Sequence, residues 1–196
     1  MPLYKRINAS LKTGNETFTF NQDNLDFQLI DFWKWSVSDL VSNATRGRLA
    51  EFIVAKALGI NTDNVRDEWQ AYDLITPGNI KIEVKSASYI QSWHQKELSK
   101  ISFSIKKSRS WDADTNIQSK ESKRQADAYI FALLKHTDKD TINPLNLDQW
   151  VFYVLTTEEI NNYPRSQHSI TLKSLEKLTK CIDYYSIKNE LHNKTK

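Results

Sequence analysis

Residues 71–87 constrain the fold more than any other part of the chain, because they contain two short strand patterns around a Pro77-Gly78 turn. Side chains along a strand alternate between its two faces. The second strand therefore places its β-branched residues on one face and its charged residues on the other: Lys81, Glu83 and Lys85. This pattern predicts a strand held in a sheet by its apolar face, with a carboxylate and an amine side by side on the opposite face.

The same hairpin would place a second carboxylate near Glu83. If the two strands pair, Asp73 comes close to Glu83. Two converging carboxylates form a site for a hard divalent cation such as Mg2+, and the neighbouring Lys85 amine can orient or activate an attacking water. An ordinary surface ion pair between Glu83 and Lys85 is the alternative. A second Glu-x-Lys, Glu121-Ser122-Lys123, lacks a strand pattern and an upstream carboxylate, which is typical of solvated surface.

This constellation resembles the PD-(D/E)XK nuclease superfamily, the restriction-endonuclease-like proteins. Asp73 matches the first acidic position of its motif, and Glu83 and Lys85 match the E-x-K part. Tyr72 stands where the motif has proline. Many members carry a glutamate on the helix before the first strand, and Glu51 matches that position. All matched residues lie within the range 46–85.

The resemblance implies an α/β fold with a restriction-endonuclease-like core, in which helices flank a mixed central sheet that contains an antiparallel meander. It also implies a Mg2+-dependent DNA endonuclease of restriction, defence or repair, with Mn2+ as a substitute and no small-molecule cofactor. Asp73, Glu83 and the backbone carbonyl of Val84 would bind the metal, and Glu51 would support it directly or through water. Lys85 would hold the water or stabilise the developing charge. Non-cleaving nucleic-acid binding on the same fold is the alternative, and a plain interaction domain is another.

Glu51 also has a local alternative. The helical stretch 49–58 is apolar almost all round, which predicts burial, and a buried carboxylate needs a compensating partner. Arg48 lies three residues back on the same face, and a metal or its water is the other partner. The sequence leaves both open.

Basic residues crowd the segment after the motif, although the net charge of +3 is too small to indicate nucleic-acid binding by itself. The cluster predicts a loop that faces DNA phosphates through Lys106, Lys107 and Arg109. A solvated loop is the alternative. Gln91 and Gln95 follow the motif closely and are candidates for phosphate contacts, with ordinary polar surface as an equal alternative.

The length of 196 residues predicts a single domain over 1–196. Residues 1–22 are expected to be irregular apart from a short strand at 17–20, and 189–196 to form a frayed tail. Helices are expected at 26–34 and 38–58, and further strands at 101–105, 126–134 and 149–156.

Cysteine content and hydropathy indicate the cellular compartment expected for the protein. A single cysteine excludes an internal disulfide and fits a reducing compartment. No apolar run approaches the roughly 20 residues that span a bilayer, and no signal-peptide pattern is visible. A cytoplasmic protein without membrane contact is therefore expected, with DNA as its partner. A homodimer stays open: double-strand cleavage often uses two active sites, but the sequence shows no interface signal.

Overall fold

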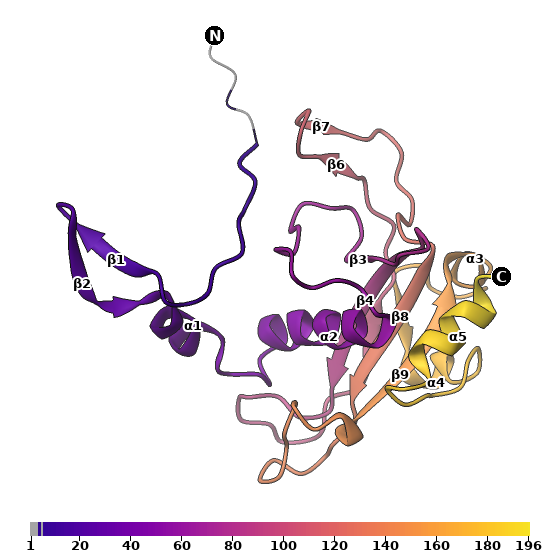
Figure 1. The fold of residues 1–196 in the computed structure, drawn as a ribbon. Coiled ribbons are helices and arrows are strands. Elements are labelled where there is room, and N and C mark those ends of the chain that lie inside the picture. Colours follow the sequence, from indigo (N-terminus) through magenta and orange to yellow (C-terminus); the bar gives the residue numbers. More distant parts are fainter. Residues whose placement is uncertain (1–3, 5) are drawn as a thin grey trace.

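A four-stranded mixed sheet forms the centre of the computed structural model, which describes residue 4 and residues 6–196. Its strand order is β3 (Leu74–Ile75), β4 (Lys81–Ser88), β8 (Ala128–Leu134) and β9 (Trp150–Thr156) (Figure 1). β4 pairs antiparallel with β3 and parallel with β8, whereas β8 and β9 are antiparallel. The predicted α/β fold, a mixed sheet flanked by helices, is confirmed.

Both faces of this sheet are covered, which explains why β8 is buried throughout and reads as an unbroken apolar run. One face packs against α2 (Asn43–Leu58) and α5 (Ile187–Lys194) through residues such as Ile82, Ile130 and Phe152. The other face packs, through Phe131 and Leu155, against α3 (Thr157–Asn161), α4 (Leu172–Leu175) and the pair β5 (Ser102–Ser104) and β10 (Ser169–Thr171). The core therefore has two layers, one on each side of β4 and β8.

Helix α2 begins later than the sequence pattern suggested, because Ser42 is its N-cap and accepts a hydrogen bond from the Thr45 amide. It ends at Gly59, whose φ of 69° is the left-handed conformation that glycine adopts without strain. Ala50 and Val54 are fully buried against the sheet. Phe52, however, is 51% exposed, so the expected burial of this helix holds on the face toward the sheet and not on the face that carries Phe52.

The expected antiparallel meander is cut short after β4. The segment predicted as its third strand, 101–105, contains β5, which pairs with β10 outside the central sheet. Its alternating apolar residues Ile101, Phe103 and Ile105 are buried in the layer beneath the sheet. The chain then forms the small hairpin of β6 (Trp111–Asp112) and β7 (Ile117–Gln118) before β8 joins β4 in parallel. A 3-10 turn, Leu147–Gln149, precedes β9.

The C-terminal segment is a helix and not the frayed tail expected from residue 189. Ile187 and Leu191, four residues apart on one face of α5, are buried in the core layer that contains α2. Lys194 Nζ also lies 2.6 Å from Glu159 Oε1. Among the described residues, no helix is both long and apolar enough to cross a membrane.

The N-terminal part forms a separate projection. β1 (Thr17–Phe20) and β2 (Asp23–Gln28) make a hairpin, and α1 (Leu29–Val37) follows directly. The predicted strand at 17–20 is confirmed, whereas the helix expected over 26–34 starts later because 23–28 pair with β1. Figure 1 shows these three elements away from the central sheet.

Candidate active site

The β3–β4 hairpin brings the predicted acidic residues to one edge of the sheet. The Asp73 amide donates to the Ile82 carbonyl (3.0 Å), and Leu74 pairs with Ile82. Continuing this antiparallel register by one residue sets Asp73 opposite Glu83. The turn is closed by the Asn79 amide, which donates to the Thr76 carbonyl (2.9 Å). The hairpin predicted from the sequence is confirmed.

Asp73 is held in place by the neighbouring strand. Its Oδ2 accepts a hydrogen bond from the Val84 amide at 2.7 Å, so backbone geometry fixes the orientation of the carboxylate. Its other oxygen, Oδ1, lies 3.7 Å from Nη2 of Arg66. The Asp73 side chain is 19% exposed, and the residue lines a pocket beside the sheet.

Glu83 and Lys85 lie two residues apart on the same face of β4 and form an ion pair, with side chains 20% and 30% exposed. Burial raises the pKa of the Glu83 carboxyl above its ordinary value, the negative charge of Asp73 raises it further, and Lys85 opposes both effects. Tyr129, opposite Glu83 on β8, has its pKa raised to about 12 by burial first and then by the charge of Glu83. Negative charge at Glu83 is therefore only partly compensated.

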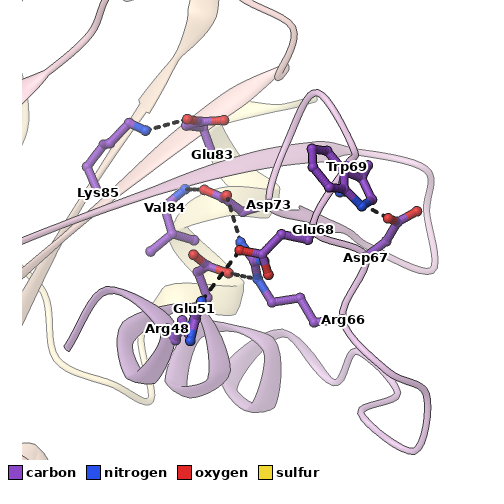
Figure 2. A network of polar contacts seen from close by, with 10 residues as sticks. All are labelled: Arg48, Glu51, Arg66, Asp67, Glu68, Trp69, Asp73, Glu83, Val84 and Lys85. Atoms are coloured by element: carbon purple, nitrogen blue, oxygen red, sulfur yellow. Dashed lines mark hydrogen bonds and ion pairs between the residues drawn. The ribbon is translucent and has the colours of Figure 1, made fainter. Parts of the chain in front are cut away.

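Glu51 projects from α2 toward a loop that connects this helix to β3, as Figure 2 shows. Its carboxylate pairs with the guanidinium of Arg66, whose Nη1 also lies 2.9 Å from Glu68 Oε2. Burial raises the pKa of Glu51, the hydrogen bond from Arg66 lowers it, and the charge of Asp73 raises it. Arg48, the partner considered from the sequence, lies instead 3.6 Å from Glu68.

Arg66 is the site residue that the sequence did not reveal. It touches Glu51 and Glu68 and approaches Asp73, so one guanidinium serves three carboxylates. The residue lies in a connection without helical or strand periodicity, and its only signal was an arginine between two predicted acidic site residues. A pocket of about 420 Å³ lies beside this network and is lined by Glu51, Arg66 and Asp73 among others.

The loop that contains Arg66, residues 60–73, is contacted by two segments distant in sequence. Arg6 Nη2 lies 2.6 Å from Asp67 Oδ2, and the rings of Trp69 and Trp111 meet edge-on with centroids 5.3 Å apart. The N-terminal segment and the β6–β7 hairpin therefore fix the position of this loop.

The carboxylates do not all converge. Across the part of the chain that the structure describes, no three His, Cys, Asp or Glu side chains are arranged to hold a metal ion. Asp73 and Glu83 are brought to the same edge by the hairpin, whereas Glu51 is turned toward Arg66. The geometry thus offers two carboxylates with a lysine, and a third carboxylate behind an arginine.

The predicted DNA-contacting residues fall into two groups. Lys106, Lys107 and Arg109 are exposed between β5 and β6, as a phosphate-binding role requires. Gln91 is buried, and its side-chain amide donates to the Ser88 carbonyl (3.0 Å). Gln95 Oε1 accepts from the backbone amide of Gln91 at 2.7 Å. Both glutamines stabilise the loop after β4, so their side chains are not free to bind phosphate.

The second Glu-x-Lys behaves as expected for surface. Lys123 Nζ lies 3.1 Å from Glu121 Oε2, and the two side chains are 57% and 68% exposed. A bare Glu-x-Lys spacing therefore does not distinguish the two copies. The paired strand and the Asp73 carboxylate do.

An α/β sheet with an Asp, a Glu and a Lys side chain at one edge is a candidate hydrolytic site, and comparison with known families supports that class. The family model described as Bacteriophage T4 endonuclease IV matches residues 21–174, which include the central sheet, α2 and all of the network in Figure 2. The chain belongs to the bacteriophage T4 endonuclease IV family, and the match supports a nuclease activity. No curated protein sequence matches the chain significantly.

Proposed function

We propose that the chain is a Mg2+-dependent DNA endonuclease whose chemistry resembles that of PD-(D/E)XK enzymes. The observation that carries the proposal is the juxtaposition of Asp73 with the Glu83–Lys85 pair on two paired strands, inside the range that matches a family of endonucleases. The alternative of an isolated surface ion pair explains Glu83 and Lys85 but not the carboxylate held opposite them.

The donor chemistry fits a hard cation. Carboxylate and carbonyl oxygens are the ligands that Mg2+ prefers, and Asp73, Glu83 and the Val84 carbonyl would supply them. The raised pKa of Glu83 also indicates a carboxylate that needs more positive charge than Lys85 alone provides. A bound Mg2+ would polarise the scissile phosphate and lower the pKa of a water molecule. Mn2+ would bind the same oxygens.

The protein's own groups have distinct tasks. The Val84 amide orients Asp73, so that one carboxylate oxygen is fixed before any ligand arrives. Lys85, beside Glu83, would orient the attacking water or stabilise the negative charge that develops on the phosphate. Lys106, Lys107 and Arg109 would contact DNA phosphates without reading sequence.

Arg66 would act as an internal substitute for the metal. It neutralises Glu51 and approaches Asp73, and the contact with Asp73, at 3.7 Å, is its longest. A cation at Asp73 and Glu83 would replace that contact, while Arg66 stays bound to Glu51. Glu51 would then support the site through Arg66 or through water.

The decisive test is incubation of the purified protein with plasmid and linear DNA in Mg2+, in Mn2+ and in EDTA. We expect cleavage with either metal and none with EDTA. Asp73→Asn and Glu83→Gln should both abolish cleavage, whereas the matched control Glu121→Gln should cut as the wild type does. Undiminished cleavage in EDTA would overturn metal dependence. Binding of DNA without cleavage under every condition would favour the non-cleaving module.

A further inference from the structure

The N-terminal arm, defined as residues 16–39 and comprising β1, β2 and α1, has no buried residue. Seven of its large apolar side chains are exposed, from 37% for Leu25 to 83% for Trp35; the others are Phe18, Phe20, Phe27, Phe32 and Val37. Leu29, Ile30 and Trp33 are half-buried. Figure 1 shows the arm projecting from the body of the molecule. Such a concentration of exposed aromatic residues marks an interaction surface.

The arm nevertheless has a defined shape. Asn21 and Gln22 both have positive φ, 51° and 72°, as a tight two-residue hairpin turn requires. Phe18 and Phe27 pack across the strands with ring centroids 4.7 Å apart. A lone two-stranded hairpin with a nine-residue helix is at best marginally stable in water, so this shape needs a covering surface.

The arm is directed away from its own body by the link to α2. Asp39 Oδ1 accepts hydrogen bonds from the amides of Val41 (3.1 Å) and Ser42 (3.0 Å), and Ser42 in turn caps α2. These bonds stabilise the turn between α1 and α2, and Figure 1 shows the arm away from the central sheet. The covering surface must therefore come from another molecule.

Charge indicates which molecule this is. The arm contains five acidic residues and one basic residue, whereas the chain as a whole has 24 acidic and 27 basic residues. The remainder of the chain thus has 19 acidic and 26 basic residues. An acidic arm would repel DNA phosphates, and two acidic arms would repel each other. It is complementary to the basic body of a second copy of the chain.

We propose that the arm docks on the body of a second copy, whose arm docks in return, so that two copies form an arm-exchanged dimer. Reciprocal exchange gives a closed two-fold assembly in which both arms are covered by equivalent contacts. The inference rests on the exposure and charge of the arm and is independent of the nuclease chemistry.

Light scattering coupled to size-exclusion chromatography tests the proposal on the full chain. We expect a mass about twice 22.9 kDa at micromolar concentration. The double variant Phe20→Ser with Trp35→Ser should run as a monomer with unchanged circular dichroism. The matched control, Thr19→Ser with Asn24→Ser, changes two exposed polar side chains of the arm, keeps its apolar residues and charges, and should stay dimeric.

A second variant keeps the proposal testable if the double variant fails to fold. Asp23→Lys with Asp26→Lys leaves the apolar residues in place and should raise the dimer dissociation constant at least about tenfold, because the arm loses its charge complementarity. A monomeric wild type, or an arm variant that keeps the dimer mass, would overturn the proposal. An arm variant of unchanged mass that loses DNA binding would assign the arm to DNA instead.

Discussion

Glu83 occupies a position that disfavours its own charge, since it is largely buried, its pKa is raised further by the charge of Asp73, and its ion-pair partner is Lys85. Glu51 has the same difficulty and relies on Arg66. Carboxylates with raised pKa values beside specific charged partners are typical of functional sites, although structural networks show them too. At the scale of single residues, the site therefore carries negative charges that Lys85 and Arg66 compensate only in part.

Removing the lysine should separate chemistry from binding. Lys85→Ala should lower the cleavage rate by about 10²-fold or more, because a group that positions or deprotonates water contributes on that order. DNA affinity should change little, since one lysine adds little to a footprint of several phosphates. Cleavage assays and fluorescence anisotropy measure the two effects. Lys123→Ala is the control, and a Lys85→Ala enzyme that cuts at the wild-type rate would refute the mechanism.

The raised pKa of Glu83 predicts that, without metal, the free energy of unfolding falls as the pH rises. Because the folded protein binds this proton more tightly than the unfolded chain, the contribution of Glu83 falls as pH rises from about 4.5 through its raised value. Glu83→Gln should flatten this part of the melting-temperature profile in EDTA. In the wild type, stabilisation by millimolar Mg2+ should grow over the same interval as the carboxylate ionises. A melting temperature unaffected by Mg2+ at any pH would contradict a preformed metal site.

Arg66→Gln should leave Glu51 and Asp73 without their cation. We expect a loss of about 1 kcal/mol in the free energy of unfolding in EDTA, a modest value because the Arg66 side chain is 35% exposed. Mg2+ should then stabilise the variant more than it stabilises the wild type. Denaturant titrations with and without Mg2+ measure both. Arg48→Gln, which removes an exposed contact to Glu68, is the control and should change neither.

At the scale of elements, the sequence correctly predicted those strands and turns that are determined by a local residue pattern. The period-two alternation of β4, the Pro-Gly turn and the apolar run of β8 were sufficient to predict the hairpin and the buried strand. Parallel pairing of β4 with β8, and the departure of β5 to pair with β10, depend on contacts between distant segments and have no local signature. Arg66 was missed for the same reason, because its partners are brought together only by the fold.

The C-terminal helix shows how a polar composition can conceal a structural element. Leu191→Ala should destabilise the fold by about 2–4 kcal/mol, because it removes a side chain that is only 3% exposed in the core layer beneath α2. His192→Ala, one position along and exposed, should be nearly neutral. Urea unfolding followed by circular dichroism measures the difference. Equal stability of the two variants would contradict a packed helix at residues 187–194 and support the frayed tail expected from the sequence.

At the scale of the whole molecule, charge is distributed unevenly, with an acidic arm and a basic remainder. Reversing Lys106, Lys107 and Arg109 to Glu should weaken DNA binding at low salt and reduce the steepness of its salt dependence, because fewer counterions are released. Binding titrations at several salt concentrations measure the slope. Lys177→Glu with Lys180→Glu, also exposed but on a different part of the chain, is the control. An unchanged slope in the triple variant would exclude this loop from the DNA surface.

The contact between Arg6 and Asp67 joins the start of the chain to the loop that positions Arg66. Trp111 reaches the same loop from the other direction along the sequence. Closing contacts between segments so far apart is slow compared with forming a hairpin or a helix. We therefore expect the β3–β4 hairpin to form early in folding, and the loop that contains Arg66 to settle later, when Arg6 and Trp111 have reached Asp67 and Trp69. A fusion tag or a shortened N-terminus, remote from the carboxylates in sequence, would then disturb the charge balance of the site.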